Sequence, residues 1–131
     1  MKKLKIVIDE KIPFLNGVFD RYAETLLLPG DKIQLKHVVD ADAMIVRTRT
    51  KCNRQLLEGT RVKCIATATI GFDHIDTDFC RKNNIYWNNA AGCNSGAVAQ
   101  YIAVALLKTA EKFGFNLKDM TIGIEIGRAH V

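Results

Sequence analysis

The residues best suited to chemistry lie between positions 63 and 76, where the chain reads KCIATATIGFDHID. The apolar run at its start is typical of a short strand that is buried on both faces. Thr67, Thr69 and Gly71 follow, and Asp76 is placed to cap a helix. A strand, a small-residue loop and a helix start can form an anion cradle, because glycine lets a ligand approach backbone N–H groups. A βα connection that binds nothing has the same pattern, so this stretch alone leaves both interpretations open.

The composition of the 131-residue chain is that of a globular domain, with 48% hydrophobic and 25% charged residues. Its net charge of +5 comes from dispersed lysines and arginines, whereas nucleic-acid binding favours basic runs interleaved with aromatic residues. No apolar stretch has the length of a membrane span, and the N-terminal residues lack the pattern of a secretory signal. We therefore expect a cytoplasmic protein with no nucleic-acid and no membrane partner.

Neither the cysteines nor the histidines have the spacing of a metal site. The cysteines are widely separated and include no C-x-x-C pair, at Cys52, Cys64, Cys80 and Cys93. The histidines are equally dispersed, at His37, His74 and His130. We therefore expect reduced thiols, no disulfide framework and no bound metal.

Short β-rich runs alternate with helical patterns, which predicts βα units and a parallel sheet. The expected strands cover residues 4–9, 24–28, 43–46, 64–68 and 85–87. The expected helices cover residues 14–22, 53–57, 76–82 and 95–112, with a short helical turn within residues 34–39. Ligands of such sheets bind at the carboxyl ends of the strands. Three polar strand exits should therefore meet at one edge, at residues 47–50, 67–71 and 88–94.

The longest expected helix is apolar around most of its circumference between residues 97 and 107. Such a helix is normally buried between layers, and it is too short to cross a bilayer. The sheet layer can cover only one side of it. We therefore expect some of its apolar residues to be exposed, among Val98, Tyr101, Ile102 and Leu106.

The chain resembles the D-2-hydroxyacid dehydrogenases in four segments, which occur in the family's order: IVIDEKIPF, DADAMIVRTRTKCN, ATATIGFDHID and NNAAGCNSGAVAQY. The pair ATATIG and AAGCN is similar to a narrower group in that family, which acts on a phosphorylated hydroxy acid. The resemblance implies an α/β fold, with a flavodoxin-like substrate domain before a Rossmann domain. It also implies an NAD-dependent dehydrogenase that is a homodimer at full length.

The resemblance divides the chain into three parts. Residues 1–94 form the substrate-binding domain, and residues 95–118 form an interdomain helix and connection. Residues 119–131 are the start of a truncated NAD-binding domain, whose first strand is expected at residues 120–124.

Two hydroxyl residues, Thr48 and Thr69, occupy the positions of the family's substrate contacts. Hydroxyl and N–H groups suit a carboxylate or a phosphate. As alternatives, Thr48 is a turn residue and Thr69 a loop residue whose hydroxyl group bonds its own backbone. Two neighbours depart from the family's pattern, because Phe72 replaces a small polar residue and Arg49 an apolar one.

The family's pattern stops before the cofactor-binding motif. The motif G-x-G-x-x-G should follow residue 124, because its glycines let a pyrophosphate approach a helix N-terminus. In ungapped register the three glycine positions hold Ile126, Arg128 and Val131. The family's catalytic arginine, glutamate and histidine are absent too, so no catalytic, cofactor-binding or metal-binding residue is assigned. We therefore expect the 131-residue chain alone to be inactive and to bind NAD no better than background. NADH formation by the purified chain would contradict this.

The C-terminal segment EIGRAHV, residues 125–131, can be encoded by GAG ATC GGA AGA GCA CAC GTC. That DNA contains a common short-read sequencing adapter. Because the family's pattern ends at Glu125, we hypothesise that residues 125–131 are not native sequence. Sequencing the source locus across this codon tests the hypothesis, and a genomic EIGRAHV followed by a stop codon would refute it.

The leading interpretation is the N-terminal part of an NAD-dependent dehydrogenase of a small phosphorylated 2-hydroxy acid. One alternative is another D-2-hydroxyacid dehydrogenase, such as one that acts on 3-phosphoglycerate. The other is a non-catalytic flavodoxin-like module that binds an anion. Continuation of the gene into G-x-G-x-x-G would favour the enzymes over the module.

Overall fold

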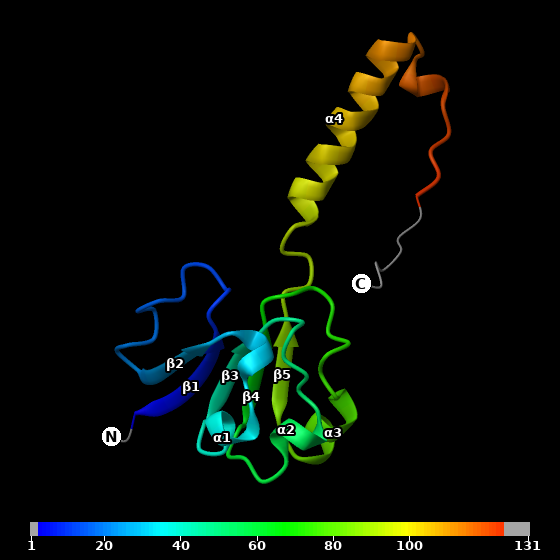
Figure 1. The fold of residues 1–131 in the computed structure, drawn as a ribbon. Helices are drawn as coiled ribbons and strands as arrows, with labels where there is room; N and C mark the ends of the chain where they lie inside the picture. The colour runs from blue at the N-terminus through cyan, green and yellow to red at the C-terminus, as the bar shows by residue number, and fades with distance from the viewer. Residues whose placement is uncertain (1–2, 125–131) are drawn as a thin grey trace. The chain divides into compact units, whose positions relative to one another are not determined.

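A computed structural model describes residues 3–124 of the chain (Figure 1). The chain divides into two compact units, Met1–Cys93 and Asn94–Val131. The first unit is a sheet with short helices, and the second contains one long helix. Across residues 3–124, no helix combines the length and the apolar character that a bilayer span needs.

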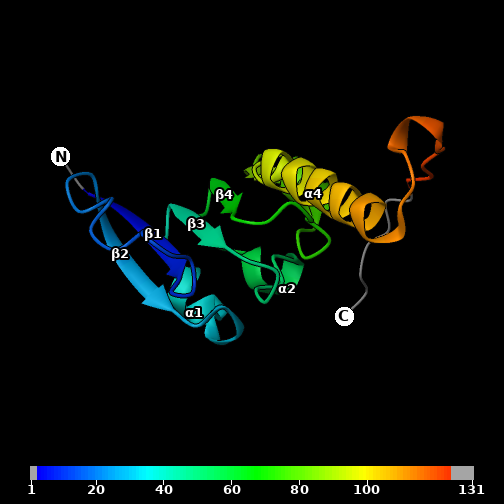
Figure 2. The same cartoon turned by 90° about the horizontal axis from the view of Figure 1, so that it is seen from above.

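All five strands of the first unit pair in parallel, in the order β2-β1-β3-β4-β5 (Figure 1). Figure 2 shows the part β2-β1-β3-β4 of this order from above. They are β1 (Leu4–Asp9), β2 (Ala23–Leu28), β3 (Ala43–Val46), β4 (Cys64–Thr67) and β5 (Tyr86–Asn89). This is the flavodoxin-like order, which has a topological switch point between β1 and β3. The predicted parallel α/β sheet is confirmed, although the bounds of β2, β4 and β5 differ from the predicted ones by one or two residues.

Short helices connect the strands: α1 (Leu35–Val38), α2 (Arg54–Leu57) and α3 (Thr77–Lys82), with a 3-10 turn, η1 (Gly30–Lys32), before α1. Two of them begin at a capping side chain, and one of these, Asp76, was predicted from the sequence. Asn53 accepts a hydrogen bond from the backbone N–H of Leu56 at 3.2 Å, before α2. Asp76 accepts one from the N–H of Phe79 at 2.9 Å, before α3. Both side chains satisfy donors that have no partner within the helix.

Residues 14–22, predicted as a helix, form consecutive turns instead, so this prediction was wrong. Phe14 and Gly17 have positive φ angles of 63° and 78°, and such left-handed residues interrupt an α-helix. The apolar spacing nevertheless reflects burial, because Leu15 and Phe19 of this segment pack against a core cluster. That cluster consists of Ile6, Ile8 and Ala23.

The main core lies on the other face of the sheet. Alternate residues of β1 belong to different clusters, with Val7 in the main core between Ile6 and Ile8 of the smaller one, as a pleated strand requires. Met44 and Ile65, from the two central strands, are fully buried in the main core. Residues of all three short helices complete it, including Val38, Leu56, Leu57 and Cys80.

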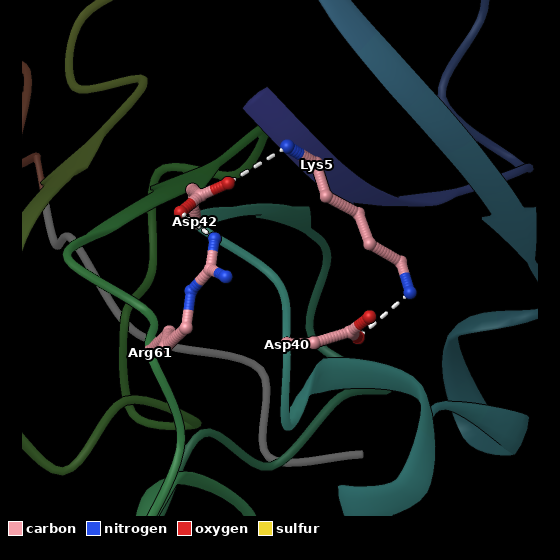
Figure 3. Close-up of polar contacts among 4 residues, drawn as sticks. All are labelled: Lys5, Asp40, Asp42 and Arg61. Carbon is pink, nitrogen blue, oxygen red and sulfur yellow. Dashed lines mark hydrogen bonds and ion pairs between the residues drawn. The ribbon is translucent and has the colours of Figure 1, made fainter. Parts of the chain in front are cut away.

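A polar cluster joins the amino ends of β1 and β3 to the segment before β4 (Figure 3). The carboxylate of Asp42 accepts a hydrogen bond from the backbone N–H of Lys5 at 2.9 Å and pairs with the guanidinium of Arg61. The ammonium of Lys5 donates to Asp40 at 2.7 Å. This hydrogen bond lowers the pKa of Asp40, so the small contribution of this pair is present above the usual Asp pKa and is lost in acid.

The second unit contains α4 (Ser95–Phe113), which agrees with the long helix predicted at residues 95–112. The helix ends at Gly114, whose φ of 68° is left-handed and whose N–H donates to the carbonyl of Ala110 at 2.9 Å. No residue of α4 is buried. The expected exposure is confirmed for Val98, Tyr101 and Ile102, while Leu106 is half-buried.

The strand predicted at residues 120–124 is not present, so this prediction was wrong. A 3-10 turn, η2 (Leu117–Asp119), precedes the segment, which forms neither helix nor strand. A β-strand needs a neighbouring strand to receive its hydrogen bonds. Within residues 3–124, every strand belongs to the sheet of the first unit, and the second unit contains none. Residues 125–131, for which a non-native origin was hypothesised, lie outside the described residues.

Candidate functional site

The sheet brings two of the predicted polar exits to the same level of one edge. Val46 of β3 pairs with Thr67 of β4. Thr48 and Thr69 each lie two residues beyond this pair, in the turns that follow two adjacent parallel strands. The backbone N–H of Ala68 donates to the carbonyl of Val46 at 2.9 Å, which extends the ladder past the strand ends. The two predicted residues therefore follow paired residues of adjacent strands at the same distance along the chain.

Three successive carbonyl groups of the loop after β4 are occupied by hydrogen bonds. The carbonyl of Thr69 accepts from the N–H of Ala90 at 3.1 Å. The carbonyl of Ile70 accepts from the side-chain amide of Asn89 at 2.6 Å. The carbonyl of Gly71 accepts from the Thr69 hydroxyl at 2.9 Å. Because Asn89 and Ala90 lie at the end of β5, the third polar exit holds the second in place.

The backbone N–H groups of Ile70 and Gly71 donate to no acceptor within residues 3–124. No peptide bond among residues 3–124 is cis, so each N–H of the loop points away from the carbonyl of the preceding residue. Because the carbonyls of Thr69 and Ile70 bond to the end of β5, these two N–H groups point away from it. Two successive free N–H groups on one side of the loop are hydrogen-bond donors for an anion. A Cβ added to Gly71 would meet no atom within 4 Å apart from its chain neighbours. A ligand therefore has room to approach the backbone there.

The hydroxyl groups of the two predicted substrate-binding residues differ. Thr48 is exposed, and its hydroxyl group makes no hydrogen bond with any described residue, so it can donate to a ligand. The Thr69 hydroxyl already donates to the carbonyl of Gly71, which is the local bond that the sequence left open as an alternative. Thr69 therefore contributes to the site through its position in the loop, and its hydroxyl proton is not available to a ligand. A substrate-binding role of Thr48 and Thr69 stays a prediction.

A cationic groove lies at the switch point of the sheet, and Arg47 and Arg49, the two sequence neighbours of Thr48, line it. Two adjoining hollows of about 570 and 340 Å³ share Gly30, Asp31 and Arg49 among their lining residues. Lys51 lines the larger hollow and Arg47 the smaller one. Within residues 3–124, none of these three cations forms an ion pair. Their charges are thus available to an anion, as a groove of one sign attracts its counter-ion.

Two carboxylates also line this groove, and each has a partner. Asp9 is buried, and its Oδ1 accepts a hydrogen bond from the backbone N–H of Lys11 at 2.9 Å. Asp31 lies 3.8 Å from the ammonium of Lys32. Sequence reasoning did not find this groove, because its residues come from three separate strand exits. The available signal was the alternation of cations and threonines in RTRTK.

Sequence reasoning also missed His74 as part of the site. Its Nε2 lies 2.9 Å from the Thr67 hydroxyl oxygen, which lies 2.7 Å from that of Thr69. Burial lowers the pKa of His74, and the nearby charge of Asp73 opposes this effect, so the ring is neutral at neutral pH. The contact depends on how residues 70–73 turn, which spacing along the chain does not reveal. Within residues 3–124, no three His, Cys, Asp or Glu side chains are grouped for a metal ion.

Comparison with known proteins gives the family. The model of the family "D-isomer specific 2-hydroxyacid dehydrogenase, catalytic domain" matches residues 13–117. The chain belongs to this family. The resemblance in the four sequence segments is therefore confirmed.

This dehydrogenase chain is similar to curated relatives over nearly its whole length. It is 52% identical over 122 residues to an erythronate-4-phosphate dehydrogenase of Bacteroides fragilis, which covers 92% of the chain. It is 43% identical over 128 residues to one of Porphyromonas gingivalis, which covers 98% of the chain. The chain spans only about a third of these relatives, 35% and 34% of their lengths.

Solved structures of dehydrogenases share the fold. One is a 3-phosphoglycerate dehydrogenase of Entamoeba histolytica with bound NAD+, with a TM-score of 0.61 and 27% identity over 76% of this chain and 37% of that one. Another is a D-lactate dehydrogenase of Aquifex aeolicus with NAD and lactic acid, with a TM-score of 0.64 and 21% identity over 78% of this chain and 32% of that one. Dehydrogenases with this fold thus include NAD complexes.

Proposed function

We propose that the chain is the N-terminal, substrate-binding part of an erythronate-4-phosphate dehydrogenase. The full-length enzyme would oxidise 4-phospho-D-erythronate to 2-oxo-3-hydroxy-4-phosphobutanoate in pyridoxal 5'-phosphate (vitamin B6) biosynthesis. The observation that carries the proposal is the presence of two separate anion-binding features, the loop after β4 and the cationic groove, at one sheet edge. The substrate has two anionic ends, a carboxylate and a phosphate, whereas a hydroxy acid such as lactate has one.

The two features suit the two anions differently. The N–H groups of Ile70 and Gly71 and the rotatable hydroxyl group of Thr48 present neutral donors, which suit a carboxylate. Arg47 and Arg49 present guanidinium groups, which match the geometry of a phosphate in bidentate contacts. In the proposed binding mode the carboxylate lies at the loop and the phosphate in the groove. The carbon chain that carries the reacting hydroxyl group lies between them.

The described residues do not fit NAD. The expected first Rossmann strand at residues 120–124 is not formed, and the glycine positions of the fingerprint hold Ile126, Arg128 and Val131, outside the described residues. We therefore place NAD binding and the catalytic residues in the rest of a longer enzyme, with residues 1–94 as its substrate domain. We further propose that this enzyme is a cytoplasmic homodimer.

The test is an NADH-formation assay of the full-length gene product with 4-phospho-D-erythronate, 3-phosphoglycerate and D-lactate. We expect the highest kcat/KM with 4-phospho-D-erythronate. Arg49→Ala should raise the KM for this substrate about tenfold, the usual loss for one charge-assisted hydrogen bond. It should not alter the KM for unphosphorylated D-erythronate, which has no second anion.

Lys82→Ala is a matched control, because Lys82 is an exposed cation on α3 and does not line the groove. Its kinetics should equal those of the unmodified enzyme. A preference for 3-phosphoglycerate would support the alternative dehydrogenase. No oxidation of any of the three acids, together with phosphate binding, would support the non-catalytic module.

A further inference from the structure

We propose that His74 and Thr67 are positioning residues that orient the anion-binding loop after β4. They act through a hydrogen-bond relay in which each group donates to the next. The relay runs from the ring of His74 through the hydroxyl groups of Thr67 and Thr69 to the carbonyl of Gly71. This inference rests on the proposed function, because the ligand that the oriented loop serves is the carboxylate of the hydroxy acid.

The direction of the relay follows from the number of protons. Each threonine hydroxyl has one proton to donate, and that of Thr69 goes to the carbonyl of Gly71 at 2.9 Å. The Thr69 oxygen must therefore accept in its 2.7 Å contact with Thr67, which uses the one proton of Thr67. The Thr67 oxygen then accepts in its 2.9 Å contact with His74, so Nε2 carries the proton.

The relay begins at a fixed point. Thr67 is the last residue of β4 and is 3% exposed. The backbone carbonyl of His74 accepts a hydrogen bond from the N–H of Cys52 at 2.8 Å, and the N–H of Asp76 donates to the carbonyl of Cys52 at 2.9 Å. These bonds form a parallel bridge between Cys52 and Ile75. The bridge ties His74 to the segment after β3, so its ring cannot follow the loop if the loop moves.

As a consequence, three successive carbonyl groups of the loop are held by hydrogen bonds. Asn89 and Ala90 hold two of the carbonyls, and the relay holds that of Gly71. Without the proton from His74, Thr67 can turn its own proton away from Thr69, and the last of the three bonds loses its fixed direction. Donors that are oriented before binding increase affinity, because their ordering costs nothing further when the ligand binds.

Kinetics of two variants of the full-length enzyme test the relay. His74→Leu removes the donor, while His74→Gln keeps an N–H at a similar reach. We expect His74→Leu to raise the KM for the hydroxy acid about tenfold, the usual effect of one lost hydrogen bond, with kcat within about twofold. His74→Gln should restore the KM to within about threefold of the unmodified value. Equal impairment by both variants would overturn the proposal.

Asp42→Ala controls for a loss of stability, because Asp42 belongs to the polar cluster at the opposite, amino-terminal edge (Figure 3). It should lower the melting temperature and leave the KM unchanged. A raised KM in this variant would show that the His74→Leu effect reflects stability alone, which overturns the relay.

A second readout does not depend on the substrate. Nitrogen NMR of histidine-labelled full-length protein at neutral pH should show His74 with the proton on Nε2. A proton on Nδ1 instead would overturn the relay. The KM comparison uses whichever D-2-hydroxy acid the unmodified enzyme oxidises best. A different best substrate would therefore refute the proposed function, while the comparison of His74→Leu with His74→Gln still decides on the relay.

Discussion

Gly30→Ala is expected to destabilise the first unit by about 3 kcal/mol, at the upper end of the usual cost of overpacking. A Cβ at this position would lie 2.6 Å from Oδ2 of Asp9 and 3.2 Å from the hydroxyl oxygen of Thr50. Neither neighbour can move easily. Asp9 is 1% exposed and accepts a hydrogen bond from Lys11, while Thr50 is 2% exposed and donates to the carbonyl of Gly30 at 2.9 Å.

Urea unfolding followed by the fluorescence of Trp87 measures this effect. Trp87 is the single tryptophan, and its ring lies 5.0 Å from that of Phe72, beside the main core. Gly96→Ala is the matched control, since a Cβ added there would meet no atom within 4 Å other than the backbone of α4 itself. This control should leave the Trp87 transition in place.

A double-mutant cycle with Asp9→Ala identifies the cause. If the clash with the carboxylate is responsible, Gly30→Ala should cost much less in the Asp9→Ala background. An unchanged unfolding midpoint for Gly30→Ala alone would mean that Asp9 and Thr50 shift without cost. In that case the close packing at the switch point does not hold the groove in shape.

The sheet could be predicted from the sequence because its central strands are apolar and largely buried: β1 is buried on both faces, and β3 and β4 are buried on one face and half-buried on the other. β1 and β3 are short apolar runs between polar residues, and their predicted bounds agree with the structure. The helix predicted at residues 14–22 was wrong. The apolar spacing of Leu15 and Phe19 reflects their burial, whereas left-handed residues interrupt a helical backbone in this segment. The strand predicted at residues 120–124 was wrong because a β-strand requires hydrogen bonds to a neighbouring strand, and amino-acid composition alone does not provide them.

The sequence could predict those features of the site that follow from the register of neighbouring strands. Parallel pairing alone brings Thr48 and Thr69 to one level, once β3 and β4 are recognised. The contact of Gly30 with Asp9 and that of Thr67 with His74 depend on the paths of loops, to within a few tenths of an ångström. Sequence patterns do not specify such distances, so the groove and the relay required the structure.

The exposed apolar face of α4 is expected to make the 131-residue chain self-associate. Val98, Tyr101 and Ile102 lie on one face of the helix by their i, i+3, i+4 spacing, and they are 46%, 76% and 42% exposed. Leaving ~300 Å² of apolar surface in water, at ~25 cal/mol per Å², forgoes about 7 kcal/mol, comparable to the whole stability of a small domain. A patch of this kind favours association. We propose that the NAD-binding domain covers this face in the full-length enzyme, as the family resemblance implies.

Size-exclusion chromatography with light scattering and a thermal melt tests this expectation. The unmodified chain should elute as aggregates or mixed oligomers with a broad melt. The triple variant Val98→Gln, Tyr101→Gln, Ile102→Gln should shift it to a monomer, because polar side chains remove the apolar patch. The pair Lys108→Gln and Glu111→Gln is the control, since it changes two exposed residues of the same helix, which pair at 2.9 Å, without altering the apolar face. A monodisperse, cooperatively melting monomer for the unmodified chain would show that α4 finds cover within the chain itself.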